Sequence, residues 1–216
     1  MSTSSAPHRG RLFVIAAPSG AGKTSLVRAL MEHDPSLRFS ISYTTRQKRP
    51  NEVDGRDYFF VANEAFAAMV EQGELLEHAR VFDNFYGTSR RQVEASLGAG
   101  QDLILEIDWQ GAQQIRRAMP ECISIFILPP SRAELERRLR SRATDTDEVI
   151  RRRLRDAAAD MTHWHEFDYV VVNDDFERAL DDLRGIVRGA QPERAVVGRA
   201  ELRDLVAELT EAGVGG

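Results

Sequence analysis

One stretch of the sequence, FVIAAPSGAGKTSLV at residues 13–27, constrains the fold more than any other. An apolar run reaches Ala17, a Pro-Ser-Gly-Ala-Gly turn follows, and Lys23 and Thr24 open a helical pattern. A strand, a glycine turn and a helix in this order form a phosphate-cradling loop, usually written G-x-x-x-x-G-K-[ST]. Ala17 takes the place of the first glycine of that pattern. Because it stands at the end of the predicted strand, an alanine costs little there unless its φ must be positive.

Each residue type in this loop has a physical task. Gly20 and Gly22 would provide the positive φ angles and the close backbone approach that a Cβ would block. The backbone N–H groups from Gly20 to Thr24 and the helix N-terminus would face phosphate oxygens. Lys23 would reach the β- and γ-phosphates of a nucleoside triphosphate, and the Thr24 hydroxyl would bind Mg²⁺. The loop by itself fits a GTPase, an ATPase, a small-molecule kinase or a nucleotide kinase.

Length and composition limit the class of protein. A chain of 216 residues can form one well-buried domain with inserted lobes and is too short for two full enzyme domains. Its net charge of -5 argues against a general nucleic-acid or membrane-surface binder. The single cysteine, Cys122, excludes an intramolecular disulfide and favours a reducing compartment. With no long apolar segment near the N-terminus, we predict a cytoplasmic protein without a secretion signal or a membrane span.

Apolar runs alternate with helical patterns along most of the chain. The runs predict buried strands at 12–16, 103–107, 123–128 and 169–172. The helical patterns lie at 24–33, roughly 111–118, 131–141, 146–164 and 175–189. This alternation predicts a doubly wound α/β core with a parallel sheet. Residues 40 to about 98 break the rhythm and predict an inserted mixed α/β lobe, with a helical segment near 63–73.

The tail beyond Pro192 forms a separate piece. Leu202, Leu205, Val206 and Leu209 follow the i, i+3, i+4, i+7 spacing of one apolar helix face. We expect this helix to pack back on the body of the protein. A role in self-association stays open.

A second group of residues lies in the irregular lobe. Arg46 and Arg49 stand three apart, and two guanidinium groups suit a dianionic phosphate better than a lone carboxylate. Glu77 could accept from both N1–H and N2–H₂ of guanine, while Ser42 or Thr88 could donate to O6. Adenine has no proton at N1, so a buried carboxylate facing it would stay unpaired. This chemistry favours a guanine nucleotide as the second ligand.

Arginines are dense between residues 132 and 155. For most of them we expect a charged helix face balanced by acidic residues, because no aromatic residue interrupts the run and the chain is acidic. Two or three would suit a lid, since arginines delivered by closure stabilise the charge of phosphoryl transfer and help to exclude water. The histidines His78, His163 and His165 are expected to be structural, because an anionic phosphate acceptor needs no general base.

Taken together, these residues resemble the bacterial guanylate kinases over about residues 10–190. The resemblance rests on blocks that follow one another in order: APSGAGKTSL, SYTTRQKRPNEVDGRDYFFV, LLEHARVFDNFYGTS, LILEIDWQGAQQI, SIFILPPS, RRLRSRATDTDEVIRRRL and DYVVVNDDF. It implies a P-loop fold, in which a doubly wound parallel sheet core carries a mixed α/β GMP-binding lobe and a helical lid. It also implies Mg²⁺-dependent transfer of the ATP γ-phosphoryl group to GMP, which gives ADP and GDP. We expect dGMP to be accepted as well.

The resemblance assigns roles residue by residue. The GMP phosphate would be held by Arg46, Arg49, Tyr58 and Tyr86. The guanine would be read by Ser42, Glu77, Thr88 and Asp108. ATP would be bound by Asn173, which would touch adenine, and by the loop residues Ala17, Pro18, Ser19, Gly20, Ala21, Gly22, Lys23 and Thr24. The lid would contribute Arg138, Arg142 and Arg153, which would act in catalysis with Lys23 and Arg46.

The same resemblance divides the chain into regions. The kinase domain would span 10–190, with a core of about 10–39, 99–136 and 156–190, a GMP-binding lobe of about 40–98 and a lid of about 137–155. Residues 191–216 would form a C-terminal helical tail. Two positions depart from the family pattern: Glu106 replaces its usual Asp, and Ala143 replaces a lid glycine. Ala17 is a known variant of the family's loop.

Two alternatives come from other functional classes. A guanylate-kinase-like module that binds phosphopeptides without catalysis typically lacks the glycine turn and its lysine, which are present here. A kinase for another monophosphate would differ only in the lobe, and Glu77 with the nearby hydroxyls disfavours it. The expected partners are GMP and ATP, without nucleic acid or membrane, and the oligomeric state stays open.

Overall fold

The computed structural model describes residues 9–81, 83–141, 146–189 and 199–211. The predicted lid residue Arg142 and the departure Ala143 lie outside these ranges. Internal contacts divide the chain into two compact units. The first comprises the residues up to Val14 and Asp34–Ile123, and the second comprises Ile15–His33 and the residues from Ser124 on. The predicted division into core, lobe and lid stays a prediction.

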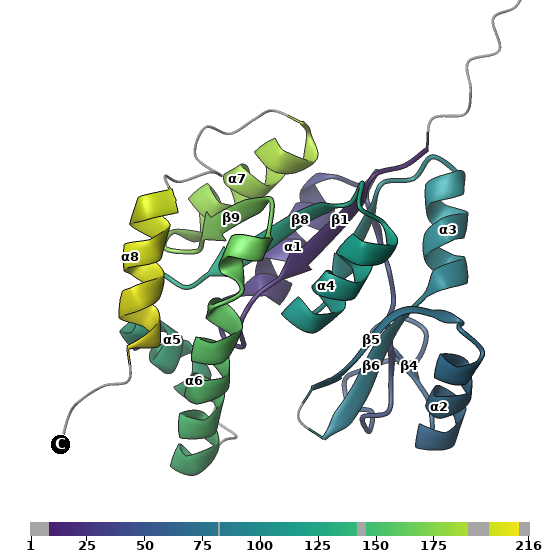
Figure 1. Cartoon of the computed structure of the whole chain (residues 1–216), viewed down its shortest axis with the longest axis horizontal. Helices are drawn as coiled ribbons and strands as arrows, with labels where there is room; N and C mark the ends of the chain where they lie inside the picture. Colours follow the sequence, from purple (N-terminus) through teal and green to yellow (C-terminus); the bar gives the residue numbers. More distant parts are fainter. Residues whose placement is uncertain (1–8, 82, 142–145, 190–198, 212–216) are drawn as a thin grey trace, which may run out of the picture. The chain divides into compact units, whose positions relative to one another are not determined.

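The first unit contains most of the described strands, drawn in purple, blue and teal in Figure 1. Its strands are the first part of β1(Leu12–Ala16) and β2(Arg38–Phe39), β3(Tyr43–Thr44), β4(Phe59–Phe60), β5(Leu75–Val81), β6(Asn84–Ser89) and β7(Leu103–Glu106). Its helices are α2(Asn63–Glu71), α3(Arg90–Gly98) and α4(Trp109–Ala118). β3 to β6 form a four-stranded sheet of order β4-β3-β6-β5, and β5 and β6 form an antiparallel hairpin. The mixed α/β character predicted for residues 40–98 is therefore present.

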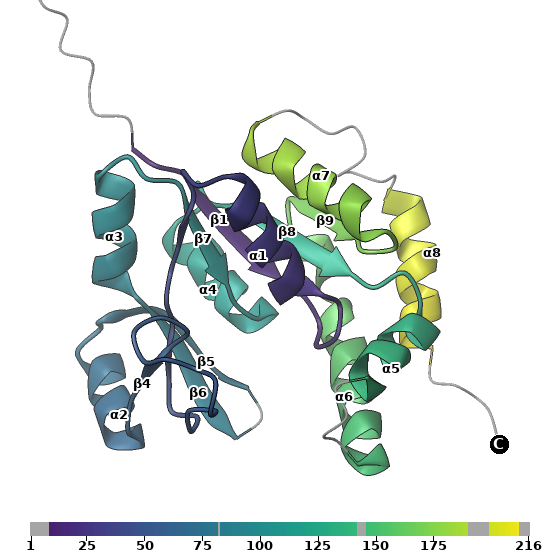
Figure 2. The same ribbon diagram turned by 180° about the vertical axis from the view of Figure 1, so that it is seen from behind.

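The second unit begins within β1 and is mainly helical, as Figure 2 shows from behind. Its elements are α1(Lys23–His33), β8(Ile123–Leu128), α5(Arg132–Arg140), α6(Asp147–Met161), the 3-10 helix η1(Trp164–Glu166), β9(Tyr169–Val172), α7(Phe176–Val187) and α8(Arg199–Thr210). β1, β8 and β9 are neighbours in the strand order β2-β7-β1-β8-β9. The pairs β2–β7 and β8–β9 are parallel, which confirms the predicted parallel sheet.

The buried strands follow from their composition. All five residues of β1 are buried, as are the last five of β8, so continuous apolar runs mark strands covered on both faces. The four predicted strands match the observed ones to within one residue. Helices supply the cover: α7 packs against α1 and β9 in the second unit.

The C-terminal helix α8 packs against α5 and α6, which confirms its predicted return to the body of the protein. Leu202, Val206 and Leu209 are buried, and Leu205 is half-buried. Figures 1 and 2 both show α8, in yellow, beside these two helices.

Candidate functional site

The glycine turn between β1 and α1 has the geometry that its sequence predicts. Gly20 and Gly22 have φ angles of 92° and 95°, in the region that residues with a Cβ rarely adopt. Space forbids a side chain as well. A Cβ at Gly22 would lie 2.4 Å from Nδ2 of Asn173, and one at Gly20 would lie 2.9 Å from Cδ1 of Leu135. The positive φ angles call for glycine at both positions, and the close approach of Asn173 adds a steric reason at Gly22.

The carbonyl oxygen of Ala21, between the two glycines, is held by two side chains. Asn173 Nδ2 donates to it at 2.8 Å and Arg138 Nη1 at 3.1 Å. Arg138 Nη2 also donates to the carbonyl of Asn173 at 3.0 Å. These two hydrogen bonds fix the position of the Ala21 carbonyl within the loop. Asn173, which is only 4 % exposed, thus stabilises the loop through its side-chain amide.

A pocket of about 460 Å³ opens beside this loop within the second unit. Its lining includes Gly20, Gly22, Arg138, Asn173 and the exposed ring of Phe176. A volume of this size suits a nucleotide or another small ligand. Glu134 borders the pocket and accepts hydrogen bonds from Arg137 and Arg138, which lower the pKa of its carboxyl to about 2. Arg138 is therefore oriented by an ionised carboxylate as well as by the loop.

The other residues predicted for the triphosphate site lie on the same unit. Lys23 and Thr24 are the first two residues of α1, at the positive end of the helix dipole. Ala17, Pro18 and Ser19 form the backbone between β1 and the glycine turn. Arg153 is half-buried on α6. Several neighbouring arginines follow the expected pattern of a balanced helix face, as Arg140 does with Glu136 and Asp147.

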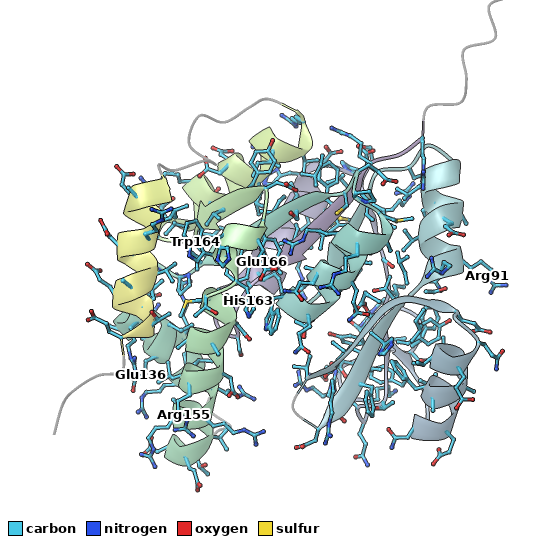
Figure 3. All side chains as sticks on the ribbon, in the orientation of Figure 1. Arg91, Glu136, Arg155, His163, Trp164 and Glu166 are labelled. Atoms are coloured by element: carbon cyan, nitrogen blue, oxygen red, sulfur yellow. The ribbon has the colours of Figure 1, made fainter. Side chains whose placement is uncertain are left out.

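The three histidines expected to be structural have different surroundings. His163 Nδ1 lies 2.6 Å from Oε1 of Glu166, and both residues are labelled in Figure 3. His165 is exposed and meets the ring of Trp164 edge-on, while His78 is exposed on β5.

In the first unit, the residues predicted to hold an acceptor phosphate gather at the end of β3. Arg46 Nη2 donates to Oε1 of Glu52 at 2.7 Å, and this hydrogen bond raises the pKa of Arg46 and lowers that of Glu52. The Arg46 guanidinium also lies over the rings of Tyr58 and Phe60, at 5.4 and 5.8 Å from their centroids. Arg46 is thereby held in place, whereas Arg49 is 71 % exposed.

Two tyrosines complete this group. The rings of Tyr58 and Tyr86 meet edge-on, with centroids 6.0 Å apart. Burial raises the pKa of Tyr58 to about 12, and the carboxylate of Glu106 adds to the shift. The hydroxyl of Tyr58 therefore stays protonated and can donate to an anion. Glu106, the position that departs from the family pattern, acts electrostatically on this group.

The residues predicted to read a base come together on β5, β6 and the start of α4. Thr88 Oγ1 donates to Oε1 of Glu77 at 2.6 Å, and the two residues are register partners in the hairpin. Asp108 caps α4 by accepting from the N–H of Gly111 at 2.8 Å. Burial raises the pKa of Glu77 to about 7; the Thr88 hydrogen bond opposes the shift and the charge of Asp108 adds to it. Ser42 is half-buried just before β3.

Sequence reasoning missed several residues that shape these groups. Glu52 orients Arg46, Phe60 lies under it, and Phe176 borders the pocket by the loop. Their residue types and spacing alone do not indicate these contacts. The spacing of six residues between Arg46 and Glu52 spans a loop, where sequence distance does not indicate contact.

Comparisons with known proteins agree on one family. A sequence model described as "Guanylate kinase" matches residues 9–190. A guanylate kinase from Hahella chejuensis is 57 % identical over 180 residues, covering 83 % of this chain and 86 % of the relative. One from Methylococcus capsulatus is 54 % identical over 203 residues, covering 93 % and 98 %. The crystal structure of guanylate kinase from Anaplasma phagocytophilum aligns with a TM-score of 0.70 at 37 % identity, over 91 % of this chain and 95 % of that one.

Proposed function

The chain belongs to the guanylate kinase family and is an enzyme of it, and on this premise we propose which of its residues bind the two substrates and how they act. The activity is phosphoryl transfer from ATP to GMP, which gives ADP and GDP. In this proposal the glycine loop and its pocket in the second unit bind ATP. In the first unit, the residues around Arg46 bind the GMP phosphate and the residues around Glu77 bind the guanine base.

The observation that carries the assignment of the base is the buried pair of Glu77 and Thr88. A carboxylate that is 3 % exposed and bonded to one hydroxyl retains lone pairs for further donors. Guanine offers two adjacent donors, N1–H and N2–H₂, and an O6 acceptor. Adenine would leave the carboxylate facing an acceptor, which costs the desolvation of an unpaired charge.

The acceptor phosphate is proposed to sit against the cationic and phenolic groups beside β3. Arg46 is preorganised by Glu52, and Tyr58 keeps its proton, so both donate to phosphate oxygens. Arg49, whose exposed side chain has only a distant ion pair with Glu52 at 4.0 Å, would turn toward the same anion. A phosphate oxygen of GMP is already an anionic nucleophile, so no protein general base is required.

Transfer forms a bond between a GMP phosphate oxygen and the γ-phosphorus, and it breaks the bond from that phosphorus to the β–γ bridging oxygen. Lys23 and the N–H groups of the loop would stabilise the charge that shifts toward ADP. Arg138 and Arg153 would stabilise the moving group, and the predicted lid residue Arg142 would join them. Exclusion of water by such a lid would suppress hydrolysis of ATP.

Mg²⁺ is proposed to enter with ATP. The donor set fits, since Thr24 at the first turn of α1 offers one hard hydroxyl oxygen, and Mg²⁺ usually takes one or two protein oxygens beside substrate phosphates and waters. When bound, the ion neutralises charge on the phosphate oxygens.

The alternatives have no observation in their favour. A non-catalytic module would need neither the two positive-φ glycines nor Lys23 and Thr24, all of which are present. We also propose a reducing, cytoplasmic setting, supported by the one buried cysteine, Cys122. Among the helices of the described ranges, none has the length and apolar character needed to cross a membrane.

The proposal is tested by ADP release with saturating ATP and a panel of GMP, dGMP, AMP and UMP as acceptors. We expect turnover with the guanine nucleotides and little with AMP or UMP. A chain that shows no preference for guanine nucleotides would refute the assignment.

A further inference from the structure

Helix α4 lies beside strand β5, as both views of the ribbon show (Figures 1 and 2). Gly111 of this helix lies against Glu77 of the strand. Both belong to the first unit. β5 ends the sheet order β4-β3-β6-β5, so within the described residues one side of its backbone has no neighbouring strand. Backbone groups on such an edge need other partners when they are covered.

Gln114 of α4 supplies these partners at His78. Its Nε2 donates to the carbonyl of His78 at 2.7 Å, and its Oε1 accepts from the N–H of the same residue at 3.1 Å. One side-chain amide thus bonds both backbone groups of His78, as a neighbouring strand would do. The contact fixes the backbone directly after Glu77.

This support matters because β5 is irregular just before Glu77. Leu75 lies opposite Ser89 and Glu77 lies opposite Thr88, so β5 advances two residues while β6 advances one. Such a bulge breaks the ladder locally and redirects the side chains that follow it. Here Glu77 is buried against Thr88, but the backbone on its N-terminal side has lost regular pairing.

Gly111 lies one helical turn before Gln114 and provides space for the carboxylate. A Cβ at Gly111 would lie 2.6 Å from Oε2 of Glu77, a distance that real Cβ atoms do not reach, and 3.3 Å from Oδ1 of Asp108. Gly111 lies within α4 and is not among the residues of positive φ, so its backbone would accept an alanine. Glycine is needed at this position because the Glu77 carboxylate occupies the volume of its missing side chain.

We propose that Gly111 and Gln114 are positioning residues for guanine recognition: Gly111 leaves the volume that the Glu77 carboxylate fills, and Gln114 holds the strand that carries it. Both act through Glu77. The inference rests on the proposed function, because it takes Glu77 as the group that reads the base. It adds two residues of α4 to the determinants of specificity.

A comparison of GMP with inosine monophosphate as substrates isolates the effect of the position of the Glu77 carboxylate. Inosine monophosphate lacks the 2-amino group, so it offers the carboxylate one donor fewer. The ratio of kcat/KM for GMP to that for inosine monophosphate therefore reports the placement of the Glu77 carboxylate. A general loss of stability or of ATP binding would lower both values and leave the ratio unchanged.

The test uses Gly111→Ala and Gln114→Met in the full chain. In Gly111→Ala the clash falls on the flexible end of a side chain, so the fold should survive and the carboxylate should move. Matched controls are Gly98→Ala at the end of α3, where a Cβ would meet nothing within 4 Å, and Gln110→Met at an exposed position of α4. We expect both test variants to raise the KM for GMP and lower the ratio about tenfold, the size of one charged hydrogen bond. The controls and the KM for ATP should stay at wild-type values.

Addition of Gly111→Ala to Glu77→Ala should change the ratio no further, because no side-chain acceptor is then left at position 77 for the new Cβ to displace. A further fall would show that Gly111 acts by another route and would overturn the inference. The inference would also be overturned if Gly111→Ala and Gln114→Met both kept the wild-type ratio while Glu77→Gln had a lower one. In that case the proposed function would stand. A wild type without preference for GMP would instead refute the proposed function and the inference together. If Gly111→Ala fails to fold by circular dichroism, Gln114→Met decides the question alone.

Discussion

The hydroxyl of Thr88 donates a hydrogen bond of 2.6 Å to Oε1 of Glu77, and the exposed fractions of the two residues are 0 % and 3 %. Burial raises the pKa of the carboxyl to about 7, and the charge of Asp108 adds to the shift, although the Thr88 hydrogen bond opposes it. The group proposed to read guanine thus changes its charge near neutral pH. Recognition of the substrate and stability of the fold should both depend on this titration.

Affinity for GMP should rise with pH. A protonated Glu77 has lost one of the charged lone pairs that accept from N1–H and N2–H₂, and a pKa of about 7 leaves most of it protonated at about pH 6. Between about pH 6 and pH 8 the ionised fraction of such a group increases about tenfold, and kcat/KM for GMP should follow. Steady-state kinetics over this range measures it. Glu77→Gln serves as the control for titration of the GMP phosphate; an equal pH dependence in that variant would assign the effect to the phosphate.

The same carboxyl should make the fold less stable as pH rises. Its pKa is raised in the folded state, so between about 4.5 and about 7 the folded chain keeps a proton that the unfolded chain has lost. The free energy of unfolding therefore falls across this window through Glu77. Melting temperatures of the wild type and of Glu77→Gln should be measured over this pH range. As the pH rises to about 7, the melting temperature of the variant should increase relative to that of the wild type. A constant difference between them at all pH values would contradict the raised pKa.

Substitution Lys23→Ala should remove turnover and leave GMP binding intact. Lys23 opens α1 beside the glycine loop, where its charge would stabilise phosphates of the donor. Loss of a preorganised group of this kind lowers kcat by about 10² to 10³. Arg28→Ala removes a positive charge from an exposed position of the same helix and is the matched control. Turnover retained in Lys23→Ala would show that the lysine has another role.

Substitution Gly22→Ala should destabilise the loop and weaken ATP binding. Its φ of 95° is strained for alanine, and the new Cβ would lie 2.4 Å from Nδ2 of Asn173, which holds the Ala21 carbonyl. We expect a loss of about 2 kcal/mol of unfolding free energy and a higher KM for ATP. Thermal melting and ATP titration measure the two effects. Gly98→Ala should show neither, and an unchanged Gly22→Ala would argue against a rigid loop.

Much of the fold was predictable because continuous apolar runs identify strands that are buried on both faces. The runs at β1, β8 and β9 were found to the residue. The hairpin of β5 and β6 was not delimited, since the bulge between Leu75 and Glu77 breaks the alternation that marks a strand. Local pattern reading fails where backbone irregularity serves to place a side chain.

The candidate site was predictable where residue type alone limits the chemistry. The two glycines of the loop have positive φ angles, and the glycine-rich pattern of the loop predicts this from the sequence alone. The contribution of Gly111 could not be read in the same way, because its missing Cβ matters only through Glu77, which is far away in sequence. Glu52 and Gln114 are likewise defined by contacts that tertiary packing creates.

The central claim is that the buried carboxylate of Glu77 selects guanine. It is tested most directly by the ratio of kcat/KM for GMP to that for AMP, measured in the wild type and in Glu77→Gln at about pH 8, where the carboxylate is ionised. We predict a large ratio in the wild type that falls by at least about tenfold in the variant. An equal ratio in the two proteins would contradict the claim and move recognition of the base to other residues.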